Sequence, residues 1–241
     1  MSWLSVDTDV EAGEDKVYTG YNGITETGAY PMKILMAKVV PSATSSAESI
    51  VFDFETRDGK TISAKLWIKS SKTNAAYYVD RKTGKKVALP DVIKLNAIGT
   101  ILGLESAPRR QEAMVEEYDF DAKADVPKKR EVFPELIGKF IGGCVTMTRY
   151  NKQEKQGDEY VAIADDYTVA EITHYYRVED EKFASEIKEG KSAKELDKWR
   201  SRNNDSYVHD RRTIKDAAPA TAQSSSAGTP EPEPESAPTG W

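Results

Sequence analysis

The chain has 241 residues and a hydrophobic content of 39%, which is enough for one large domain or two small ones with a core. Its single cysteine, Cys144, and its two histidines exclude an internal disulfide and leave too few ligands for a usual zinc site, so we expect no metal and no cofactor. No apolar run approaches about 18 residues and the first residues lack the regions of a signal peptide, so we expect a soluble cytoplasmic protein without a membrane partner.

The formal net charge of −6 argues at first sight against a nucleic-acid ligand, but the charge is unevenly distributed. Residues 1–16 carry five acidic side chains and one lysine, and residues 217–241 carry three glutamates and no basic residue. Residues 65–86, in contrast, carry seven basic side chains against Asp80 alone. A nearly neutral body with a basic strip and acidic ends is compatible with binding a polyanion along one groove.

The first third of the chain predicts an acidic arm followed by two strands. Residues 1–17 form the arm, for which we expect little regular structure. The β-favouring run 29–40 predicts the first strand. After a small, polar connection the alternating run 49–56 predicts the second strand, with Phe52 and Phe54 on its core face.

A third strand follows at once, because Asp58-Gly59 between two alternating runs is a strong signal for a tight hairpin. In the run 60–69 the even positions are apolar and face a core, whereas the odd positions face the other way. Trp67 therefore lies on the polar face, between Lys65 and Lys69. An indole flanked by cations is typical of a base-stacking platform, although packing under a loop or at a subunit contact would also explain it.

The middle of the chain predicts one helix and then irregular structure. A turn is expected at 80–86, and Pro90 opens an amphipathic helix over 91–104 that closes near Gly103. The charged segment 105–132 is interpreted as a long excursion.

The last third predicts further strands, a helix and a tail. Strands are expected at 142–150, 160–164 and 167–178, the first two joined by a polar turn at 151–158, and a short amphipathic helix is expected over 192–202. Residues 217–241 consist of small, polar and acidic residues with proline, so we expect a disordered tail that ends in Trp241.

This order predicts a mainly β (α+β) fold, a five-stranded OB-fold-like barrel with one helix between strands three and four. A β-sandwich would not need the helix, and an α/β fold would need more than one. The expected domains are the arm (1–17), the OB-like binding domain (18–178), a charged helical extension (179–216) and the tail (217–241). In this layout the third strand lies at the centre of the ligand face, and the loops 41–48 and 151–158 border its groove.

Two groups of side chains are candidates for contact with DNA. The candidate stacking residues are aromatic: Trp67, one of Tyr77 and Tyr78, Tyr150 and Tyr30. The candidate phosphate ligands are basic: Lys65, Lys69, Lys72, Arg81, Lys82, Lys85, Lys86 and Arg149. Ordinary packing of each tyrosine and a solvated face for each cation are the simpler explanations.

Four short motifs resemble those of phage-encoded single-stranded DNA-binding proteins. They are Gly-Ala-Tyr-Pro-Met-Lys-Ile at 28–34, the Asp-Gly turn at 58–59, Lys-Leu-Trp-Ile at 65–68 and Leu-Ile-Gly-Lys at 136–139. The resemblance implies an OB fold that coats single-stranded DNA in replication or recombination, inside the host cell, with homo-oligomer formation as a further possibility.

The tail is similar to those of bacterial and podophage single-stranded DNA-binding proteins, which recruit replication partners. By this resemblance Glu231, Glu233, Glu235 and Trp241 would bind a polymerase, helicase or primase. The chain departs from the family where residues 236–240 separate the acidic residues from the final aromatic. An acidic tail could also compete with DNA for the basic groove, or serve only as a solubilising segment.

The sequence carries no clear catalytic signal, so we expect that the protein is not an enzyme. Cys144 has no histidine or aspartate at a spacing typical of a nucleophile's partners, and the segment 141–144 lacks the lysine and spacing of a P-loop. Asp165-Asp166 or Glu179-Asp180-Glu181 could hold Mg²⁺ in a nuclease, but nothing places a third carboxylate beside them. The main alternative function is a non-enzymatic protein- or glycan-binding module, such as a virion or host-takeover adaptor that uses the same face.

Overall fold

The structure is a computed structural model that describes residues 23–119, 121–157 and 159–215. The chain divides into two compact units, one of residues 1–149 and 168–211 and the other of residues 150–167 and 212–241. The predicted arm (1–17) and tail (217–241), including Glu231, Glu233, Glu235 and Trp241, lie outside the described residues.

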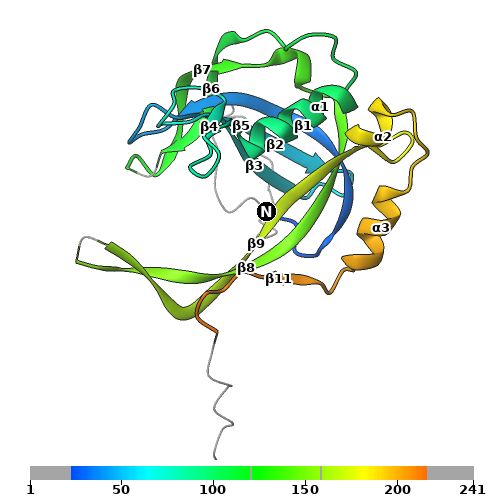
Figure 1. Ribbon diagram of the computed structural model, residues 1–241. Coiled ribbons are helices and arrows are strands. Elements are labelled where there is room, and N and C mark those ends of the chain that lie inside the picture. The colour runs from blue at the N-terminus through cyan, green and yellow to red at the C-terminus, as the bar shows by residue number, and fades with distance from the viewer. Residues whose placement is uncertain (1–22, 120, 158, 216–241) are drawn as a thin grey trace, which may run out of the picture. The chain divides into compact units, whose positions relative to one another are not determined.

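The first unit is built on an antiparallel sheet that curls into a half-barrel (Figure 1). Along the sheet the strands neighbour one another in the order β10 (Lys182–Phe183), β9 (Glu159–Arg177), β8 (Phe140–Gln156), β1 (Gly28–Pro41), β2 (Glu48–Thr56) and β3 (Thr61–Lys69). The mainly β class and the first three predicted strands are therefore confirmed.

Strand parity fixes the core of this sheet. On β2, Phe52 and Phe54 point inward and stack with ring centroids 5.7 Å apart, and on β3, Ile62 and Leu66 are buried. The hairpin between these strands turns at Gly59, whose φ of +79° lies in the left-handed region that favours glycine. Both the core face of these strands and the Asp-Gly turn are as the sequence predicts.

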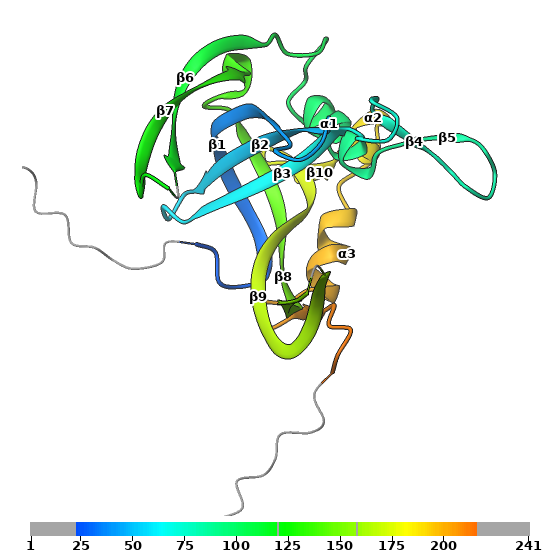
Figure 2. The same cartoon turned by 90° about the vertical axis from the view of Figure 1, so that its left-hand side faces the viewer.

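A helix packs on this core, as expected. Helix α1 (Pro90–Ile101) lies against the sheet (Figure 2). It buries Ile98 and Ile101 and starts at a proline, whose missing N–H costs nothing at a first helical position. The helix ends three residues before Leu104, because Gly103 adopts a φ of +65° and the Leu104 N–H donates to the Gly99 carbonyl.

Two short hairpins interrupt the five-strand pattern. The predicted turn at 80–86 joins β4 (Tyr77–Val79) to β5 (Lys86–Ala88). The interpretation of 105–132 as an irregular excursion is wrong, because β6 (Gln111–Asp119) and β7 (Ala124–Val132) pair antiparallel over this segment. Charged residues at half of the positions of the two strands hid the alternation, whose only buried members are Val115 and Val132. The structure therefore has more strands than the predicted five, and the exact five-stranded layout is not confirmed.

The expected turn at 151–158 is also wrong. Strand β8 continues to Gln156 and β9 begins at Glu159, so the segment is mostly strand. The two strands predicted at 160–164 and 167–178 are one continuous strand, β9. Polar sequence does not end a strand that has a partner to pair with.

The glycine pair 142–143 has a packing role. A Cβ placed at Gly142 would lie 2.2 Å from the ring of Tyr176, and one at Gly143 would lie 2.2 Å from the terminal methyl of Met32. Only glycine permits these side chains to approach the β8 backbone so closely.

After β9, the first unit ends in α2 (Ala184–Lys188), α3 (Glu195–Arg202) and β11 (Val208–Asp210), which pairs in parallel with β8. A single-turn 3₁₀ helix, η1 (Pro134–Leu136), precedes β8. The helix expected at 192–202 begins three residues later than predicted. Its start is set by buried Glu186, which accepts the N–H groups of Phe183, Lys194 and Glu195. Burial alone would raise the pKa of Glu186, but these donors outweigh it and lower the pKa.

In the second unit the Asn151 side chain holds two segments together. Its Nδ2 donates to the carbonyls of Ile163 and Ile214, and its Oδ1 accepts the N–H groups of Thr213 and Ile214. Every polar atom of this buried amide is used, so Asn151 fixes residues 213–214 beside the strands.

Candidate nucleic-acid interface

Trp67 lies on the polar face of β3, as strand parity predicts. Its side chain is 36% exposed, and the Lys65 ammonium lies 4.5 Å from the centre of its ring. Lys65 covers the indole by a cation–π contact, which a ligand ring could replace. Trp67 is therefore an exposed aromatic with a cation beside it.

The expectation that β3 lies at the centre of the face is wrong. Strand β3 is the last in the sheet, and the backbone N–H of Trp67, which has no neighbouring strand to pair with, donates to Oδ2 of Asp91 at 3.0 Å. Asp91 is in the first turn of α1. The start of α1 thus contacts the free edge of β3.

Trp67 forms one wall of a recess of about 420 Å³. Ala47, Leu89 and Pro90 supply further apolar wall, and the remaining lining residues are polar or charged: Ser45, Lys69, Ser70, Ser71 and Asp91. The loop before β2, the end of β3 and the start of α1 all contribute. Of the two loops predicted to border the groove, the one at 41–48 contributes Ser45 and Ala47 to this recess, whereas 151–158 belongs mainly to strands.

A second recess of about 650 Å³ follows along the chain. It is lined by Lys72, Thr73 and residues 78–82. The connection between the two recesses is a tight turn, in which the Ser70 N–H donates to the Ala75 carbonyl and Asn74 adopts a φ of 53°. Residues 67–82 therefore supply lining to both recesses.

The β4–β5 hairpin carries the basic cluster. Its turn is held by Asp80, whose Oδ1 accepts the N–H groups of Lys82 and Thr83. Among the described residues, none of the following cations makes an ion pair: Lys72, Arg81, Lys82, Lys85 and Lys86. Because these cations outnumber Asp80 and none of them pairs with it, the cluster keeps a net positive charge that is available to a ligand.

Two other candidate phosphate ligands, Lys69 and Arg149, lie outside this cluster. Lys69 pairs with Glu48 at 2.9 Å across β2 and β3, so its charge is largely compensated. Arg149 lies at the end of the first unit, where its carbonyl accepts the Arg211 N–H. Neither belongs to the uncompensated cluster.

The predicted tyrosines do not all reach this surface. Tyr78 is 42% exposed and lines the second recess, while Tyr77 is half-buried with the Lys86 ammonium 4.9 Å from its ring centre. Tyr30 packs against the core cluster and donates from its hydroxyl to the Glu26 carbonyl. Burial, with the charge of Glu26, raises the pKa of Tyr30. Tyr150 belongs to the second unit and lies 6.0 Å from Tyr167, centre to centre.

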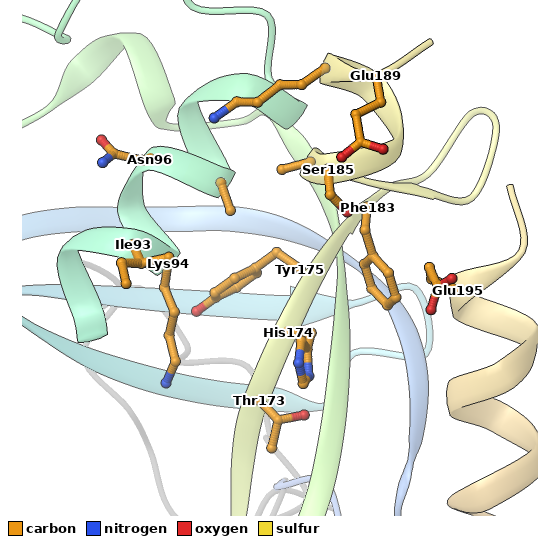
Figure 3. A pocket seen from close by; sticks show the side chains of 13 residues that line it. Ile93, Lys94, Asn96, Thr173, His174, Tyr175, Phe183, Ser185, Glu189 and Glu195 are labelled. Carbon is orange, nitrogen blue, oxygen red and sulfur yellow. The ribbon is translucent and has the colours of Figure 1, made fainter. Parts of the chain in front are cut away.

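A further recess of about 700 Å³, not expected from the sequence, lies between α1, β9 and α2 (Figure 3). Its wall includes the ring of His174, 5.8 Å from that of Phe183. Burial, with the charge of Lys94, lowers the pKa of His174. The Tyr175 hydroxyl points toward α1 and is buried with no hydrogen-bond partner among the described residues. Sequence could not reveal this recess because α2 was not predicted.

Four of the five carboxylates weighed for a nuclease, namely Asp165, Asp166, Asp180 and Glu181, are engaged by cations. Asp165 lies 3.7 Å from the Lys152 ammonium, and Asp166 lies 3.0 Å from the Arg212 guanidinium. Asp180 pairs with Arg177 at 2.6 Å, which lowers the pKa of Asp180 to about 2. Within the described part of the chain no group of three or more His, Cys, Asp or Glu side chains is placed to hold a metal ion.

No protein-family model, no curated protein and no solved structure matches the chain. No helix among the described residues is both long enough and apolar enough to cross a membrane.

Proposed function

We propose that this protein binds single-stranded DNA, with no requirement for a particular sequence, through Trp67, Tyr78 and the basic cluster of the β4–β5 hairpin. The observation that carries the proposal is the absence of carboxylate partners, among the described residues, for the five cations of that cluster. Several uncompensated cations beside one another attract a polyanion, and exposed aromatic rings beside them give its bases a stacking surface.

Single strands suit this surface better than duplexes. A base can stack on Trp67 or Tyr78 only when it is not already stacked and paired inside a helix. Stacking is tolerant of sequence, because every base has a flat π face. The combination of stacking rings and a cationic hairpin therefore favours general coating over recognition of one site.

We extend the proposal to an OB-like arrangement of the five strands β1, β2, β3, β8 and β9. The element order β1, β2, β3, α1, β8, β9 supports it, as does the sheet order, in which β3 is one end and β9, followed only by the two-residue β10, lies next to the other. A recess of about 430 Å³ lies where β3 and β9 approach each other, lined by residues 61–63 and 168–170 with Gly23 and Ile24. The two extra hairpins are insertions into this order.

The direct test is a salt-resolved titration. A fluorescently labelled oligo(dT) should gain anisotropy on adding the protein, and the affinity should fall steeply as salt is raised. If about five phosphates are neutralised, log K should fall with log salt with a slope of about −3.5. Retention on single-stranded DNA cellulose with elution by salt would agree. No binding at low salt would rule the function out and would favour the protein- or glycan-binding alternative.

The contribution of Trp67 is tested by substitution. Trp67→Ala should weaken oligo(dT) binding by about 1–3 kcal/mol, because one stacked base is lost. The fold should survive, since the side chain is on the polar face, and circular dichroism with thermal unfolding checks this. Trp199→Phe is the matched control, because Trp199 packs against the cluster of Cys144, Tyr176 and Leu196 and should leave DNA binding unchanged.

A role in replication or recombination, recruitment of a polymerase, helicase or primase by the tail, and self-association remain parts of the proposal. They rest on the resemblance of the sequence rather than on the interface. Deleting residues 217–241 should leave oligo(dT) binding measurable if the tail serves partners only, and should strengthen it if the tail competes with DNA.

A further inference from the structure

We propose that the recess beside Trp67 prefers bases that carry an exocyclic amino group, such as cytosine, over thymine, and that Asp91 sets this preference. The inference rests on the proposed binding of single-stranded DNA and adds a base preference at one position of it. The recess of about 420 Å³ is at the lower end of the roughly 300–1,000 Å³ range of small-molecule sites.

The recess has the form that a base requires. The Trp67 indole supplies a flat wall, and Leu89 and Pro90 supply apolar surface at the start of α1. A ring lying against the indole would present its polar edge to the rim, where the polar groups are Asp91, Lys69 and serine hydroxyls. Lys69 is paired with Glu48 and can only donate, so Asp91 is the charged acceptor that the rim offers to a base edge.

Asp91 has acceptor capacity left over. A carboxylate has two oxygens with about four lone-pair positions and, when ionised, no proton to donate. The Trp67 N–H occupies one position on Oδ2, and the Lys94 ammonium lies 3.6 Å from Oδ1. The Asp91 side chain is 23% exposed and is one of the residues that line the recess, and these two contacts do not use all of its acceptor positions.

Base chemistry then decides the preference. Cytosine and adenine carry amino groups that donate hydrogen bonds at the edge where thymine carries the O4 acceptor. A carboxylate attracts the amino group and repels the carbonyl oxygen, so a cytosine in the recess gains a charge-assisted hydrogen bond that thymine cannot make. Stacking alone would not distinguish these two pyrimidines to the same degree.

Asp91 also has a structural role, since a carboxylate in the first helical turn interacts favourably with the helix dipole and here holds the edge of β3. That role does not depend on the base, so it predicts equal effects on all oligonucleotides. The base preference is the property that separates the two roles.

The experiment compares labelled oligo(dC) and oligo(dT) of equal length at one salt concentration, using anisotropy. Wild-type protein should bind oligo(dC) about fivefold more tightly. Asp91→Asn keeps an oxygen for the Trp67 N–H and should bring the ratio of the two affinities close to one. Glu55→Gln is the control: it removes one negative charge from the same face of the sheet, outside the recess, and should strengthen both complexes while leaving their ratio unchanged.

Each outcome has one meaning. A wild-type ratio near one, or a ratio that persists in Asp91→Asn, overturns the base preference while leaving single-stranded DNA binding intact. If neither oligonucleotide binds, the proposed function itself fails. If Asp91→Asn lowers both affinities equally, Asp91 acts only through the fold, and the inference is wrong.

Discussion

The β4–β5 and β6–β7 hairpins are both rich in basic residues, but they differ in what surrounds each cation. In β6–β7 four acidic side chains meet the basic ones: Lys128 pairs with Asp119, Lys129 with Glu112, Arg130 with Glu117, and Arg110, just before β6, with Glu131. In β4–β5 the only carboxylate, Asp80, bonds to its own turn. A count of basic residues therefore does not measure the charge available to a ligand.

The ion pairs within β6–β7 also differ from one another in their geometry and burial. Glu117 accepts two hydrogen bonds from the Arg130 guanidinium, at 2.8 and 3.0 Å, and lies 3.2 Å from the Lys38 ammonium of β1. The side chains of this triad are mostly buried, whereas Lys129 and Glu112 are about two-thirds exposed. Glu117 thus joins this hairpin to β1 of the sheet, whereas the exposed pair of Lys129 and Glu112 lies on the surface of the hairpin.

The largest effect should come from removing the unpaired charge. Replacing Arg81, Lys82, Lys85 and Lys86 together by glutamine should weaken oligo(dT) binding roughly a hundredfold or more at about 0.1 M salt and make the salt slope shallower by about 3. The comparison variant replaces Arg110, Lys128 and Lys129 by glutamine. Because these cations are already compensated, its affinity per charge removed should change far less. Equal losses per charge in the two hairpins would contradict the distinction between them.

The next largest effect concerns stability rather than binding. Glu117→Gln should lower the free energy of unfolding by about 1–2 kcal/mol, because a charge-assisted pair with Arg130 is lost and Lys38 is left without a partner. Glu112→Gln, which breaks the exposed pair, should change it by no more than about 0.5 kcal/mol. Urea unfolding measures both. A Glu112 effect as large as that of Glu117 would show that burial does not separate the two pairs.

The same carboxylate predicts a pH dependence. The Arg130 guanidinium, with Lys38, lowers the pKa of Glu117 to about 2 from an ordinary value near 4.5. A depressed carboxyl pKa contributes stability that is complete above the unfolded pKa and is lost as the pH falls toward the folded one. The difference in stability between wild type and Glu117→Gln should therefore hold above about pH 5 and shrink between about pH 4.5 and 2. A difference that stays constant over this range would show that Glu117 acts through its shape and not its charge.

The sequence predicted the parts of this comparison that depend on local pattern. The alternation of 60–69 and the Asp58-Gly59 turn correctly placed Trp67 on the outer face of β3, because period and turn chemistry are properties of neighbouring residues. The basic strip of 65–86 was likewise visible in the composition.

Pairing between distant residues was not visible. Nothing in the run Pro127-Lys128-Lys129-Arg130 indicates that Asp119, Glu112 and Glu117 lie within reach on the partner strand, because cross-strand neighbours are set by register. The same limit placed β3 wrongly at the centre of a face, since the contact between Trp67 and Asp91 joins residues 24 apart in sequence. Asp91 was missed for that reason, although its place next to Pro90 marked it as a first-turn acid.

The smallest effect tests whether the hairpins also differ in their aromatic residues. Each carries an exposed tyrosine, Tyr78 on β4 at 42% and Tyr118 on β6 at 54% exposure. Tyr78 lines a recess with Lys72, Arg81 and Lys82, so a base stacked on its ring would have its phosphates near those cations. Tyr118 lies on the hairpin whose cations are paired.

Tyr78→Ser should therefore weaken oligo(dT) binding about three- to fivefold, toward the lower end of the stacking range, whereas Tyr118→Ser should leave it unchanged. Since both tyrosines are exposed, neither change should unfold the protein, and anisotropy titrations at one salt concentration compare them directly. If Tyr118→Ser weakened binding as much as Tyr78→Ser, exposure alone would explain the effect, and the uncompensated cations would not be what directs DNA to β4–β5.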